Sequence, residues 1–202
     1  MARKQKMLLP ALFVLAATFT SACGIFGPSD ETKAAKKLVE EANMDLRKIK
    51  EIYEQNEGDD EKPGKREQLK KALEANDAEQ VRKITDDVVY IINDGMDFAK
   101  SAIEKIQQAQ DMNVNEDYKE YLRLKELALS KQVEAFEQYR QAARTLRDSY
   151  DPKNEALRAR VKTEFDDRSE NYRELMEKAR DYSSQANELA KEAIKKEKGQ
   201  GA

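Results

Sequence analysis

VRKITDDVVYIINDGMDFAKSAIEKIQQA, residues 81–109, is the stretch that decides the fold of this chain. Apolar and small side chains recur in it at alternating steps of three and four, which is the spacing of one face of an α-helix. The pattern lasts for about four heptads, as it does in helices that pack lengthwise against a neighbour. The face consists of Val81, Ile84, Val88, Ile91, Gly95, Phe98, Ala102, Ile106 and Ala109. We therefore predict one long helix, with a capping-box-like start at Asp77 and an end near Asp111.

The rest of the chain carries the same helical signals, and its breakers fall between the periodic stretches. Charged residues make up 38% of the chain, and such a composition is typical of long exposed helices. Asn76-Asp77 is predicted to separate a short helix from the long one. Asp151 followed by Pro152 is predicted to be an N-cap with proline at the first helical position. We expect the other helices over residues 30–56, over 65–75, from Asn113 or Asn115 to near Tyr150, and from Pro152 to 198.

Short connections between long helices make neighbouring helices run antiparallel. We therefore predict an all-α fold, an elongated antiparallel up-and-down helical bundle of three long helices plus an N-terminal helix, with coiled-coil-like packing. The two central helices are each expected to have about 35 residues and a length of about 50 Å. The alternative is a coiled coil between chains. Large residues on wide apolar stripes, such as Phe98, Phe136 and Phe165, favour the closed bundle.

The N-terminus has three parts in the order that is typical of a secretory signal peptide. Three basic residues lie among the first six, an apolar stretch runs from 7 to 17, and small residues follow. The stretch is shorter than the roughly 20 apolar residues of a membrane-spanning helix, so we predict that it is removed. Thr20-Ser21-Ala22-Cys23-Gly24 then resembles the lipobox of bacterial lipoproteins.

This resemblance implies that the signal is cut before Cys23 and that the cysteine carries acyl chains. It implies membrane attachment through the lipid anchor, on the periplasmic face of the outer membrane in a Gram-negative cell and on the extracytoplasmic face of the plasma membrane otherwise. The alternative is ordinary cleavage, which releases a secreted protein with one thiol. The expected organisation is a signal peptide over 1–22, a lipidated cysteine and tether over 23–29, a bundle over 30–198 and a disordered C-terminus over 199–202.

Composition excludes several classes of function. The chain has no histidine, the commonest general base and transition-metal ligand, and its one cysteine is used by the predicted anchor. Removal of residues 1–22 takes away three basic groups and no acidic ones, so the net charge moves from -3 (37 minus 40) to -6 (34 minus 40). An acidic domain is a poor binder of nucleic acid. We predict no catalytic residue, no metal centre, no cofactor and no nucleic-acid partner.

The most suggestive polar cluster lies on the long helix, where Asp87 and Asp94 are one heptad apart beside the apolar face. With Tyr90 and Asp97 they form a candidate site for a small ligand or a hard cation, which carboxylate oxygens prefer. Gly95 would allow a close approach there. The alternative is a solvated helix flank, with Gly95 making room for a bulky neighbour.

A second candidate is an anion-binding end of the bundle. Arg140, Arg144 and Arg147 share one helix face. Interleaved acidic residues, among them Glu137 and Asp148, favour ion pairs as the alternative. The eight tyrosines offer a stacking surface in principle, but Tyr118, Tyr172 and others coincide with core or core-edge positions, so we predict that most of them pack inside.

These observations predict a membrane-anchored lipoprotein that acts as a non-enzymatic structural or protein-interaction module of the bacterial cell envelope. Its expected partner is a protein or the cell wall. The alternative is an envelope helical bundle that binds a ligand or a cation and serves as a sensor, through Asp87 to Asp97. The sequence does not decide the oligomeric state.

Overall fold

The computed structural model describes residues 31–57 and 63–200, and these form an all-helical bundle. Cys23, and with it the signal peptide and tether, lies outside the described residues. The five helices are α1 (Thr32–Glu57), α2 (Lys65–Glu74), α3 (Ala78–Gln110), α4 (Glu116–Ser149) and α5 (Glu155–Gln200). The predicted fold class is thus confirmed, and α3 and α4 have the nearly equal lengths that the sequence predicts, 33 and 34 residues.

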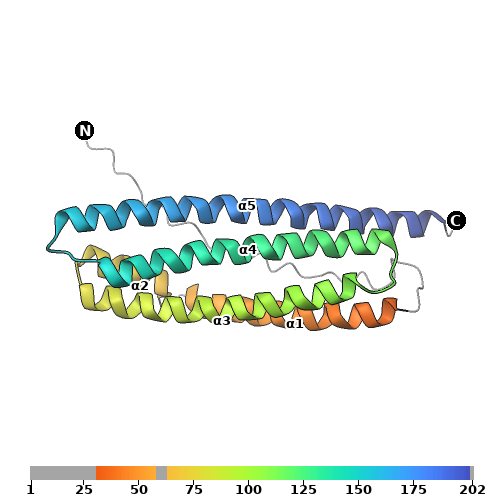
Figure 1. The fold of residues 1–202 in the computed structure, drawn as a ribbon, viewed down its shortest axis with the longest axis horizontal. Helices are drawn as coiled ribbons and strands as arrows, with labels where there is room; N and C mark the ends of the chain where they lie inside the picture. The colour runs from red at the N-terminus through yellow and green to blue at the C-terminus, as the bar shows by residue number, and fades with distance from the viewer. Residues whose placement is uncertain (1–30, 58–62, 201–202) are drawn as a thin grey trace.

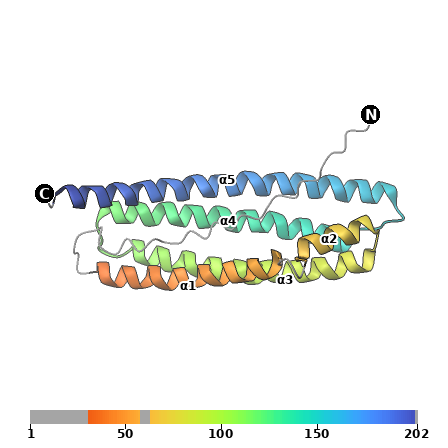
Figure 2. The same cartoon turned by 180° about the vertical axis from the view of Figure 1, so that it is seen from behind.

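The helices pack in the order in which the chain presents them. α3, α4 and α5 lie side by side with alternating directions, and α1 and α2 lie on one face of α3 (Figures 1 and 2). α5 approaches α4 most closely, whereas α1 approaches α3 most closely and touches α2. The start of α1, the end of α3, the start of α4 and the end of α5 therefore share one end of the rod.

Local caps explain where two of the helices begin. Asp77 accepts a hydrogen bond from the Gln80 amide at 3.0 Å, and Asn115 accepts one from the Tyr118 amide at 2.8 Å. Asn76 has a positive φ of 55° between α2 and α3, a conformation that asparagine tolerates better than most residues. The predicted break at Asn76-Asp77 is confirmed.

The predicted start of the last helix is wrong by three residues. Asp151 does not cap a helix, because its carboxylate accepts from the Lys153 amide at 2.9 Å in a turn that contains Pro152. Asn154 is the residue that caps α5, and its side-chain oxygen accepts from the Leu157 amide at 3.0 Å. α5 also continues to Gln200, two residues beyond the predicted end.

The core divides into two clusters along the rod. One, at the end where α1 begins, joins Ala35, Val39 and Ala42 of α1 to residues of α3, α4 and α5. The other fills the opposite end beneath α2. Both clusters combine several alanines with larger apolar and aromatic residues. None of the helices in the described ranges is long and apolar enough to cross a membrane.

Gly95 is buried in the α3 face, but the expectation of a close neighbour there is wrong. A Cβ built on Gly95 would meet no atom within 4 Å. The position is therefore underfilled rather than crowded.

Candidate functional site

The four residues of the acidic candidate site do not converge in the structure. Asp87 pairs with Lys65 of α2, and Asp97 lies 3.8 Å from Lys100. Tyr90 is 69% exposed and extends from the outer side of α3. Asp87 and Asp94 are separated along the helix by about 10 Å, because seven residues each add 1.5 Å.

No group of three acidic or cysteine side chains in the described ranges is arranged to hold a metal ion. Binding of a ligand at Asp87, Tyr90, Asp94 and Asp97 stays a prediction, and the geometry favours the solvated flank.

The arginine candidate site is occupied by the protein's own acceptors. Arg140 donates to Asn93 at 2.8 Å and pairs with Glu137 at 2.5 Å. Burial acts to raise the pKa of Glu137, but hydrogen bonds from Gln141 and Arg140 outweigh it, so the pKa is lowered. The ion-pairing interpretation is confirmed for this arginine.

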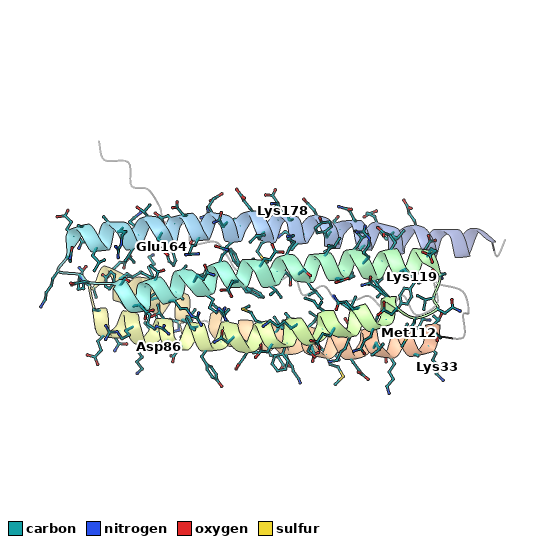
Figure 3. The ribbon with its side chains drawn as sticks, viewed as in Figure 1. Lys33, Asp86, Met112, Lys119, Glu164 and Lys178 are labelled. Carbon is teal, nitrogen blue, oxygen red and sulfur yellow. The ribbon has the colours of Figure 1, made fainter. Side chains whose placement is uncertain are left out.

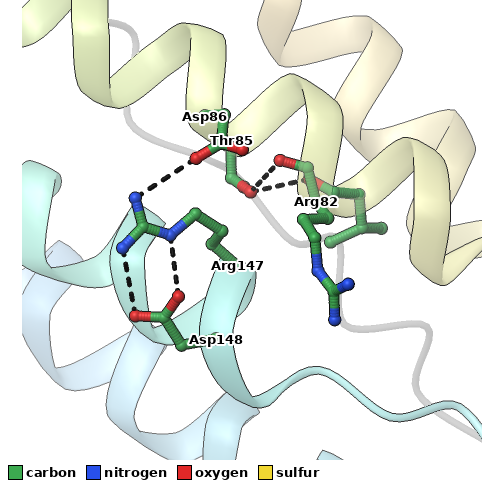
Figure 4. A network of polar contacts seen from close by, with 6 residues as sticks. Arg82, Thr85, Asp86, Arg147 and Asp148 are labelled. Carbon is green, nitrogen blue, oxygen red and sulfur yellow. Dashed lines mark hydrogen bonds and ion pairs between the residues drawn. The ribbon is translucent and has the colours of Figure 1, made fainter.

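Arg147 is held in the same way at the far end of α4. Its guanidinium donates to Asp148 at 2.7 Å and to Asp86 of α3 at 3.2 Å (Figure 4). The hydrogen bond from Arg147 is the main cause of the lowered pKa of Asp148. Arg144 is exposed. Arg140 and Arg147 thus bind acidic or amide groups of the protein itself. Anion binding by Arg140, Arg144 and Arg147 stays a prediction.

The most unusual chemistry lies inside the bundle, on α4. We call the α4 polar strip the set Tyr118, Tyr121, Lys125, Gln132 and Tyr139, all of which are buried. Four of its members recur at intervals of seven residues, so they share one face of α4. A charged or polar side chain at every second turn of a buried face is costly unless it is paired, which distinguishes this face from an ordinary core.

Lys125 is the centre of the α4 polar strip and is only 1% exposed. Its ammonium donates to Asn187 of α5 at 2.9 Å and lies 5.5 Å from the ring centre of Tyr121. Tyr118 and Tyr121 stack with their ring centres 6.1 Å apart. Burial lowers the pKa of Lys125 to about 8, and burial together with the nearby Tyr118 raises the pKa of Tyr121.

The α4 polar strip contacts α5 at its Tyr139 end as well. Tyr139 and Tyr172 lie with ring centres 6.0 Å apart. Within the described residues, the buried hydroxyls of Ser169 and Ser183 on α5 make no hydrogen bond. Buried polar atoms are normally paired, so these two hydroxyls need an explanation.

Sequence reasoning placed Tyr118 and Tyr172 in the core correctly, but it missed Lys125 and Gln132. The signal that could have found them is the heptad relation to Tyr118, because residues seven apart share a face. Comparison of the chain with protein-family models, with curated proteins and with solved structures finds no match.

Proposed function

We propose that the chain is a lipoprotein of the bacterial cell envelope, anchored through Cys23, whose helical rod acts as a non-enzymatic structural or protein-interaction module. The observation that carries this proposal is that only a short stretch of chain separates a lipobox-like cysteine from a long helical rod. Seven residues, 24–30, separate Cys23 from the first described residue, a tether of at most about 25 Å when fully extended. One end of the rod is thereby held near the membrane.

Two features support a role in binding rather than in chemistry. The chain has no histidine, and the polar side chains of the acidic and arginine candidates are largely engaged with opposite charges. The sensor alternative has no comparable support, because Asp87 and Asp97 pair with different lysines, Lys65 and Lys100.

Acylation is tested by growing cells with an alkyne-tagged fatty acid and comparing the natural protein with Cys23→Ser. We expect the tag only on the natural protein, since it has one cysteine. We also expect only the natural protein to stay with membranes after a carbonate wash. An untagged natural protein that washes off with buffer would overturn the anchor.

The interaction role is tested by photo-crosslinking in cells from exposed positions on different sides of the rod, such as Lys33, Asp86 and Lys178 (Figure 3). We expect one envelope component to be captured from one side and not from the others. A uniform background from every position would argue against a specific partner.

A further inference from the structure

α2 is the shortest of the five described helices and the least embedded in the bundle. It has 10 residues, whereas α1 has 26 and α5 has 46. Within the described ranges, its Cα atoms come within 8 Å of those of α3 and α1, but not of those of α4 or α5. An isolated helix of this length is marginal in water. α2 therefore depends for its folding on the contacts of one face with its neighbours.

The apolar contacts of α2 rest on few side chains. Leu69 and Ala72 are 3% and 7% exposed, and Leu73 packs against the same core cluster. Their spacing of three and four residues places them on one face of the helix. Burial of so few apolar side chains offsets only part of the entropic cost of ordering ten residues. Segments of this kind open locally more readily than the core does.

The two ends of α2 are held by polar contacts near the surface. Lys65 pairs with Asp87 of α3, and their side chains are 28% and 44% exposed. Asn76, just after α2, accepts from the hydroxyl of Tyr150 at 3.4 Å. Gly64 at the N-cap supplies no side-chain hydrogen bond. Exposed ion pairs and long hydrogen bonds contribute little to stability, so neither end fastens α2 firmly.

α2 covers an apolar face of α3, beside the start of that helix (Figures 1 and 2). Leu69 and Ala72 belong to the core cluster that contains Val81, Ile84 and Val88 of α3, which are 1%, 6% and 2% exposed. These three residues share one side of α3. Departure of α2 would expose part of that side and leave α3, α4 and α5 packed on each other. We call this part of α3 the α2 seat, defined by Val81, Ile84 and Val88.

We propose that α2 is a lid that opens as a unit while the rest of the bundle stays folded, and that the α2 seat then accepts an amphipathic helix of a protein partner. The seat is shaped for such a helix, because α2 occupies it with apolar residues at i, i+3 and i+4. This assignment rests on the proposed interaction role and names the surface and the class of partner for it. The seat lies at the opposite end of the rod from the start of α1, so an anchor at Cys23 would place it away from the membrane.

Hydrogen exchange of the mature acylated protein in detergent micelles tests the lid. We expect amides of α2 to exchange at least about a hundredfold faster than those of residues 95–106 in α3, which exchange only when the bundle unfolds. Leu69→Ala should speed exchange in α2 by at least about tenfold, because it removes the main apolar contact that closes the lid.

Leu129→Ala is the matched control. Leu129 is 3% exposed, as Leu69 is, but it belongs to the core cluster at the other end of the rod. Its packing is the same with the lid open or closed, so the variant should leave exchange in α2 within about twofold. It should speed exchange at residues 95–106 by at least about tenfold. Equal acceleration in α2 and α3 would show that α2 opens only with the whole bundle, and would overturn the lid.

The α2 seat is tested with a blocked, fluorescent peptide of residues 64–76, GKREQLKKALEAN, which has the sequence of α2. We expect it to bind the Leu69→Ala protein at least about tenfold more tightly than the natural protein, because the weakened lid competes less for the seat. A matched peptide with Leu69→Ser and Leu73→Ser should bind neither protein above the background of empty micelles, since it lacks the apolar face.

Equal binding of the two peptides, or no binding to either protein, would overturn the seat. A Leu69→Ala protein that forms a dimer would also overturn it, in favour of α2 from a second copy as the occupant. If lid and seat both fail while crosslinking from the outer surface captures one envelope protein, the interaction role stands and α2 does not cover its surface. If Cys23 carries no acyl chain, the anchored role fails whatever the exchange rates are.

Discussion

The protonation of Lys125 depends on how the bundle packs around its side chain. An ammonium that is removed from water favours its neutral form, because the bundle solvates the charge poorly. Burial accordingly lowers the pKa of Lys125 from 10.5 to about 8. Asn187 and the ring of Tyr121 offset part of this cost, but neither carries a full negative charge.

The linkage between this pKa and stability predicts a rise of stability with pH. Between about pH 8 and 10.5 the unfolded chain keeps the Lys125 proton and the folded chain releases it, so the free energy of unfolding increases with pH. Below that window both states are protonated, and the folded state bears the full cost of the buried charge. The gap between the two pKa values corresponds to an upper limit of about 3 kcal/mol.

Lys125→Met should therefore raise the free energy of unfolding at pH 7 by about 1 to 3 kcal/mol and flatten its pH dependence from pH 7 to 9.5. Urea denaturation of both proteins at several pH values measures this. Lys119→Met, at a partly exposed position of the same helix, is the control and should leave the slope unchanged. A variant that is less stable than the natural protein at pH 7 would show that the ammonium stabilises the bundle.

Gly95 offers a second test at a single position. Alanine at a helical site is more favourable than glycine by about 1 kcal/mol, and the added methyl group has room because no atom lies within 4 Å of it. We expect Gly95→Ala to stabilise the protein by about 1 kcal/mol in urea denaturation. Ala102→Gly, at a fully buried position of the same helix, should destabilise it by at least as much. If Gly95→Ala instead lowered the free energy of unfolding, the bundle would require the absence of a side chain at position 95.

At the scale of the elements, the turn between α4 and α5 tests which residue begins a helix. Asn154 caps α5, whereas Asp151 only closes the turn before it. Asn154→Ala should cost about 1 kcal/mol, the usual value of an N-cap. Asp151→Ala should cost less than about 0.5 kcal/mol, because no helix amide depends on it. Equal costs in thermal unfolding, or the reverse order, would contradict this assignment of the cap.

The elements were predictable where local signals decide them. Asp77 and Asn115 cap their helices as the sequence indicates, since a cap needs only the amide two or three residues ahead. The prediction at Asp151 failed because an aspartate before proline can either cap a helix or close a turn. Which of the two occurs depends here on Asn154, three residues later. The other helices were predictable because their apolar residues keep helical spacing along the whole of each helix.

The candidate site was less predictable, because the sequence does not show which polar residue of a helix faces inward. A lysine on a helix is ordinarily exposed, so Lys125 was assigned no role. Its burial depends on how α3 and α5 flank α4, and that arrangement comes from the whole bundle. Asp87 likewise resembles a ligand in the sequence, but the packing of α2 on α3 brings Lys65 to it.

At the scale of the whole molecule, the bundle is a rod whose two ends hold different parts of the chain. α1 begins at one end, where the tether from Cys23 must reach it, and the turn between α4 and α5 lies at the other. α4 alone, with 34 residues, spans about 50 Å between these ends. If the anchor is at Cys23, one end lies near the membrane and the other can extend into the surrounding compartment.

This orientation predicts different distances to the membrane for Lys33 and Lys153, which are both exposed and lie at opposite ends. The only native cysteine is the predicted acylation site, so Lys33→Cys and Lys153→Cys each provide a single site for a fluorescent donor. On vesicles that contain acceptor-labelled lipids, we expect strong energy transfer from position 33 and little from position 153. A rod that lies flat would instead give similar transfer from both positions, because its two ends would then be equally close to the lipids. That outcome would leave the anchor intact but place a side of the bundle on the membrane, where the outer surface of α3 or α5 would meet headgroups instead of a partner.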